Sequence, residues 1–209
     1  IEPEEFLRKI LCKQMNLAYV AAGQDLSFGY QGKGDRRLLE RFSGDLSYEV
    51  RIIDKVFDGE REISSTYVRE CVEKGDMEKA EELLGRAYSF TGKVERGKQL
   101  GRRLGMPTLN LYPSEEKLLP PRGVYYSRVL FEGGTYPGIT NIGYKPTVNE
   151  EKKISVETYL YDFDRDMYGS EIVTELLHYK RPEKKFENIS ELKTQMESDI
   201  SQGRQYHNC

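Results

Sequence analysis

The stretch GKVERGKQLGRRLGMPTLN (residues 92–110) places a glycine-rich, basic loop immediately before a short strand-like run. Glycines stand at 92, 97, 101 and 105, and Glu95 alone opposes the cations, which are Lys93, Arg96, Lys98, Arg102 and Arg103. Glycines let backbone N–H groups approach an anion closely, and cations offset phosphate charge. The spacing matches neither G-x-x-x-x-G-K-[ST] nor G-x-G-x-x-G. The loop therefore predicts either an anion-binding flap of another kind or a solvated hairpin with basic ends.

The run that follows the loop, PTLN, offers two neutral oxygen ligands. In a strand, Thr108 and Asn110 project to the same face, and Pro107 before them fixes φ and stiffens the start of the run. Mg²⁺ prefers oxygen ligands, keeps several waters and takes substrate phosphates into its shell. The pair therefore suits Mg-ATP, although an ordinary strand edge with two polar residues facing water would have the same pattern.

A third polar feature lies in ISVETYLYDFDRDMYG (residues 154–169). Along a strand, Val156, Thr158 and Leu160 project to one face and Glu157 to the other. Glu157 is then a lone carboxylate among apolar and β-branched residues. Such a carboxylate can act as a general base towards an alcohol, and the alternative is an exposed strand glutamate.

Composition limits the class of protein. The chain has 209 residues, of which 37% are hydrophobic and 32% charged, which suggests one or two domains. No apolar run approaches the ~20 residues that a membrane helix needs, and a net charge of −3 argues against broad nucleic-acid binding. Three separated cysteines predict reduced thiols in a cytoplasmic protein. Because the chain begins at Ile1 rather than methionine, we expect a fragment of a longer protein.

The first 85 residues predict an α/β arrangement. LAYVAAG (17–23) is a short apolar run that favours a buried strand, and YEVRIIDKV (48–56) is the next strand candidate. Helical patterns alternate with these runs: one begins at Asp35, and SSTYVRECVEKG (64–75) starts with hydroxyl caps and ends at a glycine. Strands that alternate with helices indicate part of a parallel sheet.

The composition changes near residue 85. Ten of the nineteen glycines lie between Gly85 and Gly143. Short runs rich in Tyr, Val, Ile and Thr follow, and the GG pair at 133–134 indicates a hairpin. Several short strands at this spacing favour a small closed barrel. The chain finishes with a predicted helix, ISELKTQMESDISQGRQY, which we expect Ser190 to cap.

These motifs resemble the riboflavin kinase module from about Gly85 to Tyr206. The pieces occur in that family's order: GKVxxGxxxGRxLGxPTxN at 92–110, GVYY at 123–126, NIGYKPT at 141–147, VETYLYDFDRDMYG at 156–169 and RPEKKF at 181–186. The first half resembles the C-terminal part of the FMN adenylyltransferase module that is fused to it in bacterial bifunctional enzymes. Its cues are GQDLSFGYQGKGD at 23–35 and ISSTYVRE at 63–70.

The resemblance implies an α+β two-domain fold. Residues 1–85 would be a partial Rossmann-like nucleotidyltransferase segment, and residues 86–209 a small antiparallel β-barrel with a C-terminal helix. The implied reaction is transfer of the ATP γ-phosphate to the riboflavin 5′-hydroxyl, giving FMN and ADP, with Mg²⁺ or another divalent metal as cofactor. We expect neither nucleic acid nor a membrane among the partners.

The resemblance also assigns roles to matching residues. Thr108 and Asn110 would bind the metal and the ATP phosphates, and Glu157 would accept the proton of the ribityl 5′-hydroxyl. The ATP-binding set is completed by residues of the loop, which are Gly92, Lys93, Arg96, Gly97, Gly101 and Pro107. The flavin would contact Gly123, Tyr125 and Arg181. A remnant nucleotide site of the adenylyltransferase module would include Gly29, Ser64, Ser65, Thr66 and Arg69.

Two alternatives remain open at this point. Eleven of the fifteen tyrosines lie from Tyr88 onward, and an aromatic barrel can bind a flavin without catalysis; the joint presence of Thr108, Asn110 and Glu157 argues for the enzyme. The first half could instead be retained as an interaction surface. The H-x-G-H-type motif of nucleotidyltransferases is absent, since the chain has only His178 and His207. We therefore expect this chain to make FMN but not FAD, and the full-length parent to make both.

Overall fold

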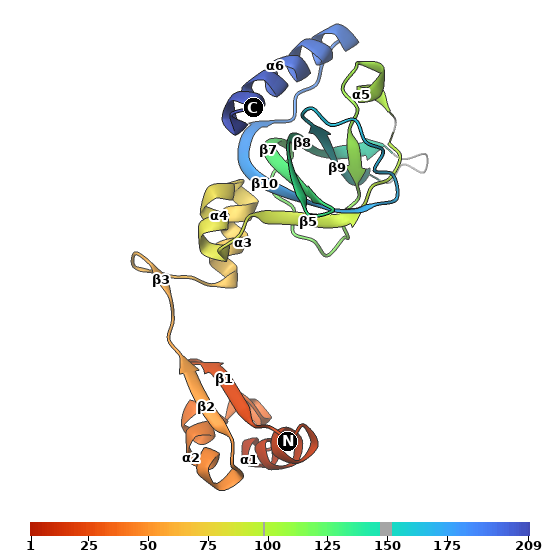
Figure 1. Cartoon of the computed structure of the whole chain (residues 1–209). Helices are drawn as coiled ribbons and strands as arrows, with labels where there is room; N and C mark the ends of the chain where they lie inside the picture. The colour runs from red at the N-terminus through yellow and green to blue at the C-terminus, as the bar shows by residue number, and fades with distance from the viewer. Residues whose placement is uncertain (98, 147–151) are drawn as a thin grey trace. The chain divides into compact units, whose positions relative to one another are not determined.

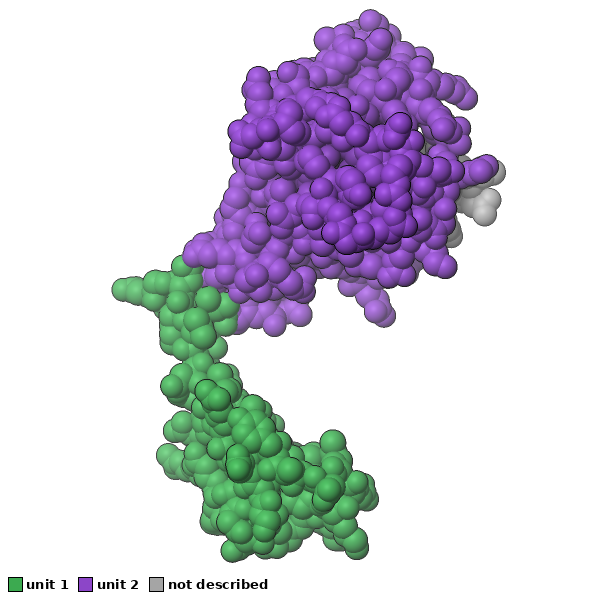
Figure 2. All heavy atoms as spheres, viewed as in Figure 1, with its two compact units in different colours: residues 1–63 green, residues 64–209 purple. Residues whose placement is uncertain are grey.

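The structure is a computed structural model that describes residues 1–97, 99–146 and 152–209. Lys98 of the basic loop and Thr147 of the NIGYKPT motif lie outside the described residues. The chain divides into two compact units, Ile1–Ile63 and Ser64–Cys209, coloured green and purple in Figure 2. Among the described residues, no helix combines the length and the apolar composition that crossing a membrane requires.

The first unit contains a parallel pair of strands with helices on one face. Its elements, in chain order, are α1 (Pro3–Glu5), the π-helix η1 (Phe6–Gln14), β1 (Tyr19–Gly23), the 3₁₀ turn η2 (Tyr30–Gly32), α2 (Arg36–Leu46), β2 (Glu49–Ile53), β3 (Phe57–Asp58) and β4 (Arg61–Glu62). β1 and β2 pair in parallel from Tyr19 opposite Glu49 to Gly23 opposite Ile53. The predicted parallel pairing and the helix start at Asp35, whose side chain accepts a bond from the Leu38 N–H (2.9 Å), are confirmed.

The prediction that the LAYVAAG run is a buried strand is wrong. In β1, Ala22 is buried, whereas Tyr19, Ala21 and Gly23 are exposed. The reason is that the sheet has two strands and one covered face: Ala22 packs with Leu7 and residues of α2 in a small core. The apolar composition of the run predicts a strand, but it does not predict how many faces of that strand other elements cover.

The second unit opens with two helices that pack on the barrel. These are α3 (Ser65–Lys74) and α4 (Met77–Leu84), which begin at the N-caps Ser64 and Asp76 and end at left-handed glycines. Cys71, Val72, Met77 and Ala80 join the barrel's hydrophobic core. The compact units therefore divide before α3. The module boundary expected at residue 85 concerns two fused sequence modules and stays a prediction.

Six antiparallel strands form the curled sheet in Figure 1. They run in the order β5-β10-β7-β8-β9-β6, with bounds β5 (Tyr88–Lys93), β6 (Leu109–Leu111), β7 (Gly123–Phe131), β8 (Gly134–Pro146), β9 (Lys152–Leu160) and β10 (Glu171–Pro182). The short helix α5 (Leu100–Arg103) lies in the basic loop, and α6 (Ile189–His207) packs on β8. The α+β fold with a small antiparallel barrel and a C-terminal helix is confirmed.

The sheet curls until its two edge strands approach each other. Glu95, just beyond β5, forms an isolated antiparallel bridge with Asn110 of β6, and the Glu95 N–H donates to the Asn110 carbonyl at 2.9 Å. On the inside of the curl, Gly92 of β5 faces the Leu111 side chain. The barrel therefore closes at the point where the basic loop leaves β5 and returns as PTLN.

Two local predictions need correction. The β7–β8 hairpin is confirmed, but its turn residues are Glu132 and Gly133, which both have positive φ, while Gly134 pairs with Phe131. The cap of α6 is Asn188 rather than Ser190, because the Asn188 side chain accepts the Glu191 N–H at 2.9 Å. Asparagine is as good an N-cap as serine, so composition alone does not choose between two caps so close in sequence.

Candidate active site

The predicted alternation along β9 is present and places Glu157 away from the core. Val156 and Thr158 are almost completely buried, at 0% and 1% exposure, and Glu157 lies on the opposite face between them. In the sheet register Glu157 is opposite Asn110 of β6 on one side and Asn141 of β8 on the other. Directly opposed residues share a face. One carboxylate and two amides therefore form a row across three strands.

Asn110 is held tightly where the barrel closes. Its side chain is 4% exposed, and its Nδ2 donates to the Thr108 carbonyl at 3.2 Å. The backbone of Gly97 lies against it so closely that a Cβ at residue 97 would be 2.4 Å from the Asn110 Oδ1 atom. A glycine is required there, since any side chain would displace either the loop or the amide. The loop residue Gly97 and the strand residue Asn110 are thus in direct contact, as the sequence suggested for loop and strand.

A first hollow, the Asn110 cavity, has a volume of about 190 Å³. It lies between the basic loop, β6 and the segment after β9, and it is lined by Gln99, Arg102, Pro107, Thr108, Leu109, Asn110, Leu160 and residues 163–168. Arg96 lies over the Tyr168 ring at 5.3 Å, at the edge of the same region. The cavity thus combines cations and neutral oxygens, which suit a polyphosphate, with two carboxylates, Asp164 and Asp166, which suit a metal ion that the polyphosphate brings.

The Asn110 cavity has a donor set that fits a metal arriving with its substrate. Among residues 1–97, 99–146 and 152–209, no group of three or more His, Cys, Asp or Glu side chains is arranged to hold a metal ion. Thr108 and Asn110 supply neutral oxygens, and the two carboxylates in the same lining, Asp164 and Asp166, are too few to hold an ion alone, so phosphate would supply the rest of the coordination shell. The residues present therefore fit Mg²⁺ bound to a nucleotide better than a permanently bound ion.

A second hollow, the Glu157 cavity, has a volume of about 280 Å³ and lies between the sheet and α6. Glu157, Asn141 and Thr108 line it from the sheet, and Leu192, Met196 and Ile200 line it from α6. The Ser155 Oγ atom donates to the Glu157 Oε1 atom at 3.4 Å. Thr108 borders both cavities, so a group held in the Asn110 cavity and a group beside Glu157 would meet at this residue.

The remaining predicted loop residues have structural explanations in part. Gly92 and Lys93 lie in β5 opposite Ile172 and Glu171 of β10, outside the lining of either cavity. Gly101 borders the Glu157 cavity, and a Cβ there would be 2.4 Å from the Met106 carbonyl oxygen, so the tight loop requires glycine. Gly101 therefore shapes the loop, whereas Gly92 and Lys93 belong to the barrel sheet.

The residues predicted to contact the flavin do not all lie at the Glu157 cavity. Tyr125 is completely buried in the barrel core, its hydroxyl donates to the Pro121 carbonyl, and burial, together with nearby Tyr179, raises the pKa of that hydroxyl. The structure therefore does not bring Tyr125 to the Glu157 cavity. Gly123 has φ +153°, and a Cβ there would be 2.2 Å from the Arg181 carbonyl oxygen. Arg181 itself lines the Glu157 cavity and forms an ion pair with Asp199 of α6.

The residues assigned to a remnant adenylyltransferase site are spread over both compact units. Gly29, with φ +74°, lies against Pro3 in the first unit. In the second unit the Ser64 hydroxyl accepts the Tyr67 N–H at 3.3 Å as the N-cap of α3, and Ser65, Thr66 and Arg69 follow within that helix. Each unit has its own structure, and a common nucleotide site for these residues stays a prediction.

Sequence reasoning missed two residues of the Glu157 cavity. Asn141 was quoted only as part of a motif, although its register opposite Glu157 follows once β8 and β9 are paired. Asp199 is an acidic residue between the apolar Met196 and Ile200 of a helix, and it is 4% exposed. A carboxylate on the apolar face of an amphipathic helix is a signal that it has a buried partner.

Comparison with known proteins gives two family matches. The Flavokinase family, described as riboflavin kinase, matches residues 84–207. The FAD_syn family, described as FAD synthetase, matches residues 1–67. The two matched ranges follow each other along the chain with a short gap between them, in the order that the motifs predicted.

Curated relatives carry one name. Proteins called bifunctional riboflavin kinase/FMN adenylyltransferase from Listeria monocytogenes and Bacillus subtilis are each 34% identical over 99% of this chain. The protein of the same name from Escherichia coli K12 is 33% identical over 97% of this chain. The chain spans 65%, 65% and 64% of the lengths of these relatives, so it corresponds to about two thirds of each.

A solved structure is similar in fold to most of the chain. It is a Streptococcus pneumoniae protein described as a macrolide-efflux protein, with a TM-score of 0.82 and 29% identity, over 95% of this chain and 64% of that one. Its printed name differs from that of the curated relatives, and the likeness supports the fold. The Flavokinase match covers more than half of the 209 residues and includes Asn110, Glu157 and both cavities. This chain belongs to the riboflavin kinase family.

Proposed function

We propose that this chain is an ATP:riboflavin 5′-phosphotransferase that produces FMN and ADP. The observation that carries the proposal is the register of Asn110 opposite Glu157, with Thr108 bordering both cavities. Passive flavin binding would require neither a buried amide at the basic loop nor a carboxylate beside it. The joint geometry therefore favours catalysis over the non-catalytic barrel.

The nucleotide is assigned to the Asn110 cavity. Arg96, Arg102 and the backbone around Gly97 lie where the triphosphate would be, and Thr108 and Asn110 would hold Mg²⁺ through their side-chain oxygens. The ion, when bound, would neutralise phosphate charge during transfer. The tight contact of Gly97 with Asn110 keeps the loop on the nucleotide and excludes water from the phosphates.

Riboflavin is assigned to the Glu157 cavity, with its ribityl chain pointing to Thr108. Glu157 accepts the proton of the 5′-hydroxyl as that oxygen bonds to the γ-phosphorus. The bond from the γ-phosphorus to the bridging oxygen breaks, and ADP leaves with that electron pair. Most of the acceleration comes from holding the two substrates in line, because little covalent chemistry is left for the protein in phosphoryl transfer.

The test is incubation of the chain with riboflavin and Mg-ATP, followed by separation of riboflavin, FMN and FAD. We expect FMN that depends on the metal and on ATP, and no FAD. Absence of FMN would contradict the kinase proposal. A second incubation, with FMN and Mg-ATP, tests the other half: FAD there would contradict our expectation that this chain lacks the adenylylation step.

Activity of the longer parent protein is a separate proposal. The FAD_syn match and the name of the curated relatives support a parent that also adenylylates FMN to FAD. Its substrates would then be riboflavin, FMN and ATP. A cytoplasmic location, proposed from three cysteines that are all free thiols in the structure, is tested by fractionation.

A further inference from the structure

The helix α6 attaches to the barrel in an unusual way. Asp199 and Gly203 are its buried residues, whereas its apolar residues Leu192, Met196 and Ile200 are half-buried and line the Glu157 cavity. A helix that covers a sheet usually buries an apolar stripe against it. Here Leu192 and Met196 border the hollow, while Ile200 also packs against a small apolar cluster of the barrel, so apolar and polar contacts together attach the helix.

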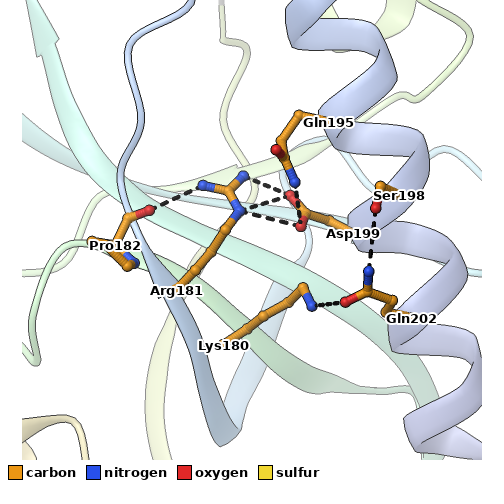
Figure 3. Close-up of polar contacts among 7 residues, drawn as sticks. All are labelled: Lys180, Arg181, Pro182, Gln195, Ser198, Asp199 and Gln202. Atoms are coloured by element: carbon orange, nitrogen blue, oxygen red, sulfur yellow. Dashed lines mark hydrogen bonds and ion pairs between the residues drawn. The ribbon is translucent and has the colours of Figure 1, made fainter.

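An ion pair between β10 and α6 is the most buried of the polar contacts (Figure 3). The Arg181 Nη2 atom donates to the Asp199 Oδ2 atom at 2.5 Å, and the Arg181 Nε atom lies 3.1 and 3.2 Å from the two carboxylate oxygens. The Gln195 amide donates to the Asp199 Oδ1 atom at 3.1 Å. Arg181 Nη1 also donates to the Pro182 carbonyl at 3.0 Å.

The geometry commits Arg181 to the protein itself. Its Nε, Nη1 and Nη2 atoms all donate to protein oxygens, and its side chain is 22% exposed against 5% for Asp199. A guanidinium with its fork directed at a carboxylate has little left to present to a substrate. Arg181 and Asp199 are also among the residues that line the Glu157 cavity.

A buried ion pair is a better device for fixing geometry than for adding stability. Withdrawing two charges from water offsets most of their attraction, whereas removing one partner leaves an uncompensated buried charge. The pair therefore makes one position of α6 against β10 much more favourable than its neighbours. Because Leu192, Met196 and Ile200 belong to the same helix, fixing Asp199 also fixes the wall that faces Glu157.

We propose that Arg181 and Asp199 are a positioning pair that selects the acceptor: through α6 they hold the apolar wall of the Glu157 cavity at the spacing that a flat, largely apolar ring system needs beside Glu157. This inference rests on the proposed kinase function. It assigns Arg181 a role through Asp199, in place of the direct flavin contact expected from sequence. The Asn110 cavity contains neither residue, so the nucleotide is unaffected.

The experiment measures KM for riboflavin, KM for ATP and kcat in variants of the pair. Arg181→Met and Asp199→Asn should each raise the riboflavin KM roughly tenfold, because a shifted wall misplaces the acceptor, and leave the ATP KM unchanged. The riboflavin KM of the double variant Arg181→Met/Asp199→Leu should be closer to the wild-type value than that of Arg181→Met alone, because the double variant leaves no unpaired buried charge. Arg181→Lys should give an intermediate value.

Lys180→Met is the matched control. Lys180 is the neighbour of Arg181, and its ammonium also links β10 to α6 by donating to Gln202, but this contact is exposed. Exposed polar contacts contribute little, so the control should behave as wild type. Hydrogen exchange gives a readout independent of turnover: α6 amides should exchange faster in Asp199→Asn while β7 and β8 stay protected.

Three results would overturn the inference. A raised riboflavin KM in Arg181→Met but not in Asp199→Asn would mean that Arg181 contacts the substrate directly. Equal increases in both KM values would mean general damage to the fold. Unchanged exchange in α6 would mean that the pair does not fix the helix. If wild type makes no FMN, the kinase proposal fails, while hydrogen exchange still reports whether the pair holds α6.

Discussion

Val156 and Glu157 are neighbours in β9 and belong to regions of opposite chemistry. The face of the sheet that contains Val156 is closed by the core of the barrel, where even the hydroxyls of Ser127, Thr140 and Thr158 are buried. The face that contains Glu157 borders two cavities and α6. Side chains on the core face pack against one another, whereas Glu157 and Asn141 on the cavity face line a hollow. One strand can therefore separate stability from activity residue by residue.

The largest expected effect is on the cavity face. Glu157→Gln should lower kcat by ~10²–10⁴-fold, because the amide cannot accept the proton of the attacking hydroxyl, and it should leave the unfolding midpoint unchanged. Stopped assays of FMN formation and thermal unfolding measure the two effects. Glu171→Gln, an exposed glutamate of β10, is the control and should be neutral. Normal turnover in Glu157→Gln would remove the general-base assignment.

The two amides beside Glu157 sharpen the comparison between cavities. Asn110→Ala should weaken Mg-ATP use by roughly 10²-fold in kcat/KM, as for lost supporting ligands at metal sites, with a steeper dependence on Mg²⁺. Asn141→Ala, on the other side of Glu157, should change the riboflavin KM instead, since Asn141 lines the Glu157 cavity only. Initial rates over a grid of both substrates and Mg²⁺ separate them. Identical effects of both substitutions would show that the cavities do not divide the substrates.

On the core face the expected effects are on stability. Thr140 Oγ1 donates to Ser127 Oγ at 2.7 Å and lies 2.8 Å from Thr158 Oγ1, whereas Thr174 Oγ1 is buried without a hydrogen-bond partner among the described residues. Thr140→Val should therefore lower the free energy of unfolding by about 1–3 kcal/mol, because it leaves two buried hydroxyls unsatisfied. Thr174→Val should raise it or leave it unchanged. Urea unfolding of both variants gives the sign, and matching losses would contradict the assigned bonding.

The smallest effect is expected at the end of α6. Burial lowers the pKa of His207 despite the hydrogen bond that its Nε2 donates to the Gly138 carbonyl at 3.2 Å. The folded pKa lies below the unfolded value of 6.5, so the unfolded chain binds more protons and stability falls as the pH drops below 6.5. Only the wild type has this imidazole, so only its unfolding midpoint should contain this pH-dependent loss. The difference in midpoint between wild type and His207→Gln should therefore shrink as the pH falls below 6.5. A constant difference across the range would rule out this contribution.

Much of the fold could be predicted from local pattern. Several features depend only on residues that are close together in the sequence, and these were predicted correctly. They are the helix caps at Asp35 and Ser64, the alternation around Glu157 and the hairpin marked by glycines. The burial of Tyr125 in the core could not be predicted, because GVYY offers adjacent tyrosines and nothing in the motif says which one faces the core. The burial of β1 was overestimated because an apolar run does not indicate how many faces of the strand are covered; here the sheet has two strands and one covered face.

The site could be predicted only as far as resemblance and spacing reach. Thr108, Asn110 and Glu157 were chosen by chemistry and motif, but the register of Asn110 opposite Glu157 depends on the pairing of β6 with β9, between residues 47 positions apart in the sequence. Asp199 was missed for the same reason. Its partner, Arg181, lies on another element, and a single acidic residue in a helix does not indicate which residue it pairs with. Tertiary pairing therefore supplied what the linear pattern could not.

The bridge between Glu95 and Asn110 bears on how a protease would attack the basic loop with and without a nucleotide. It joins the start of the basic loop to the edge strand β6, so the closure of the barrel and the nucleotide binding that we propose for the Asn110 cavity involve the same residue, Asn110. If a nucleotide binds the Asn110 cavity as we propose, its binding to the folded form alone would stabilise that form. A protease should therefore cut the loop readily in the absence of nucleotide and slowly once the nucleotide is bound.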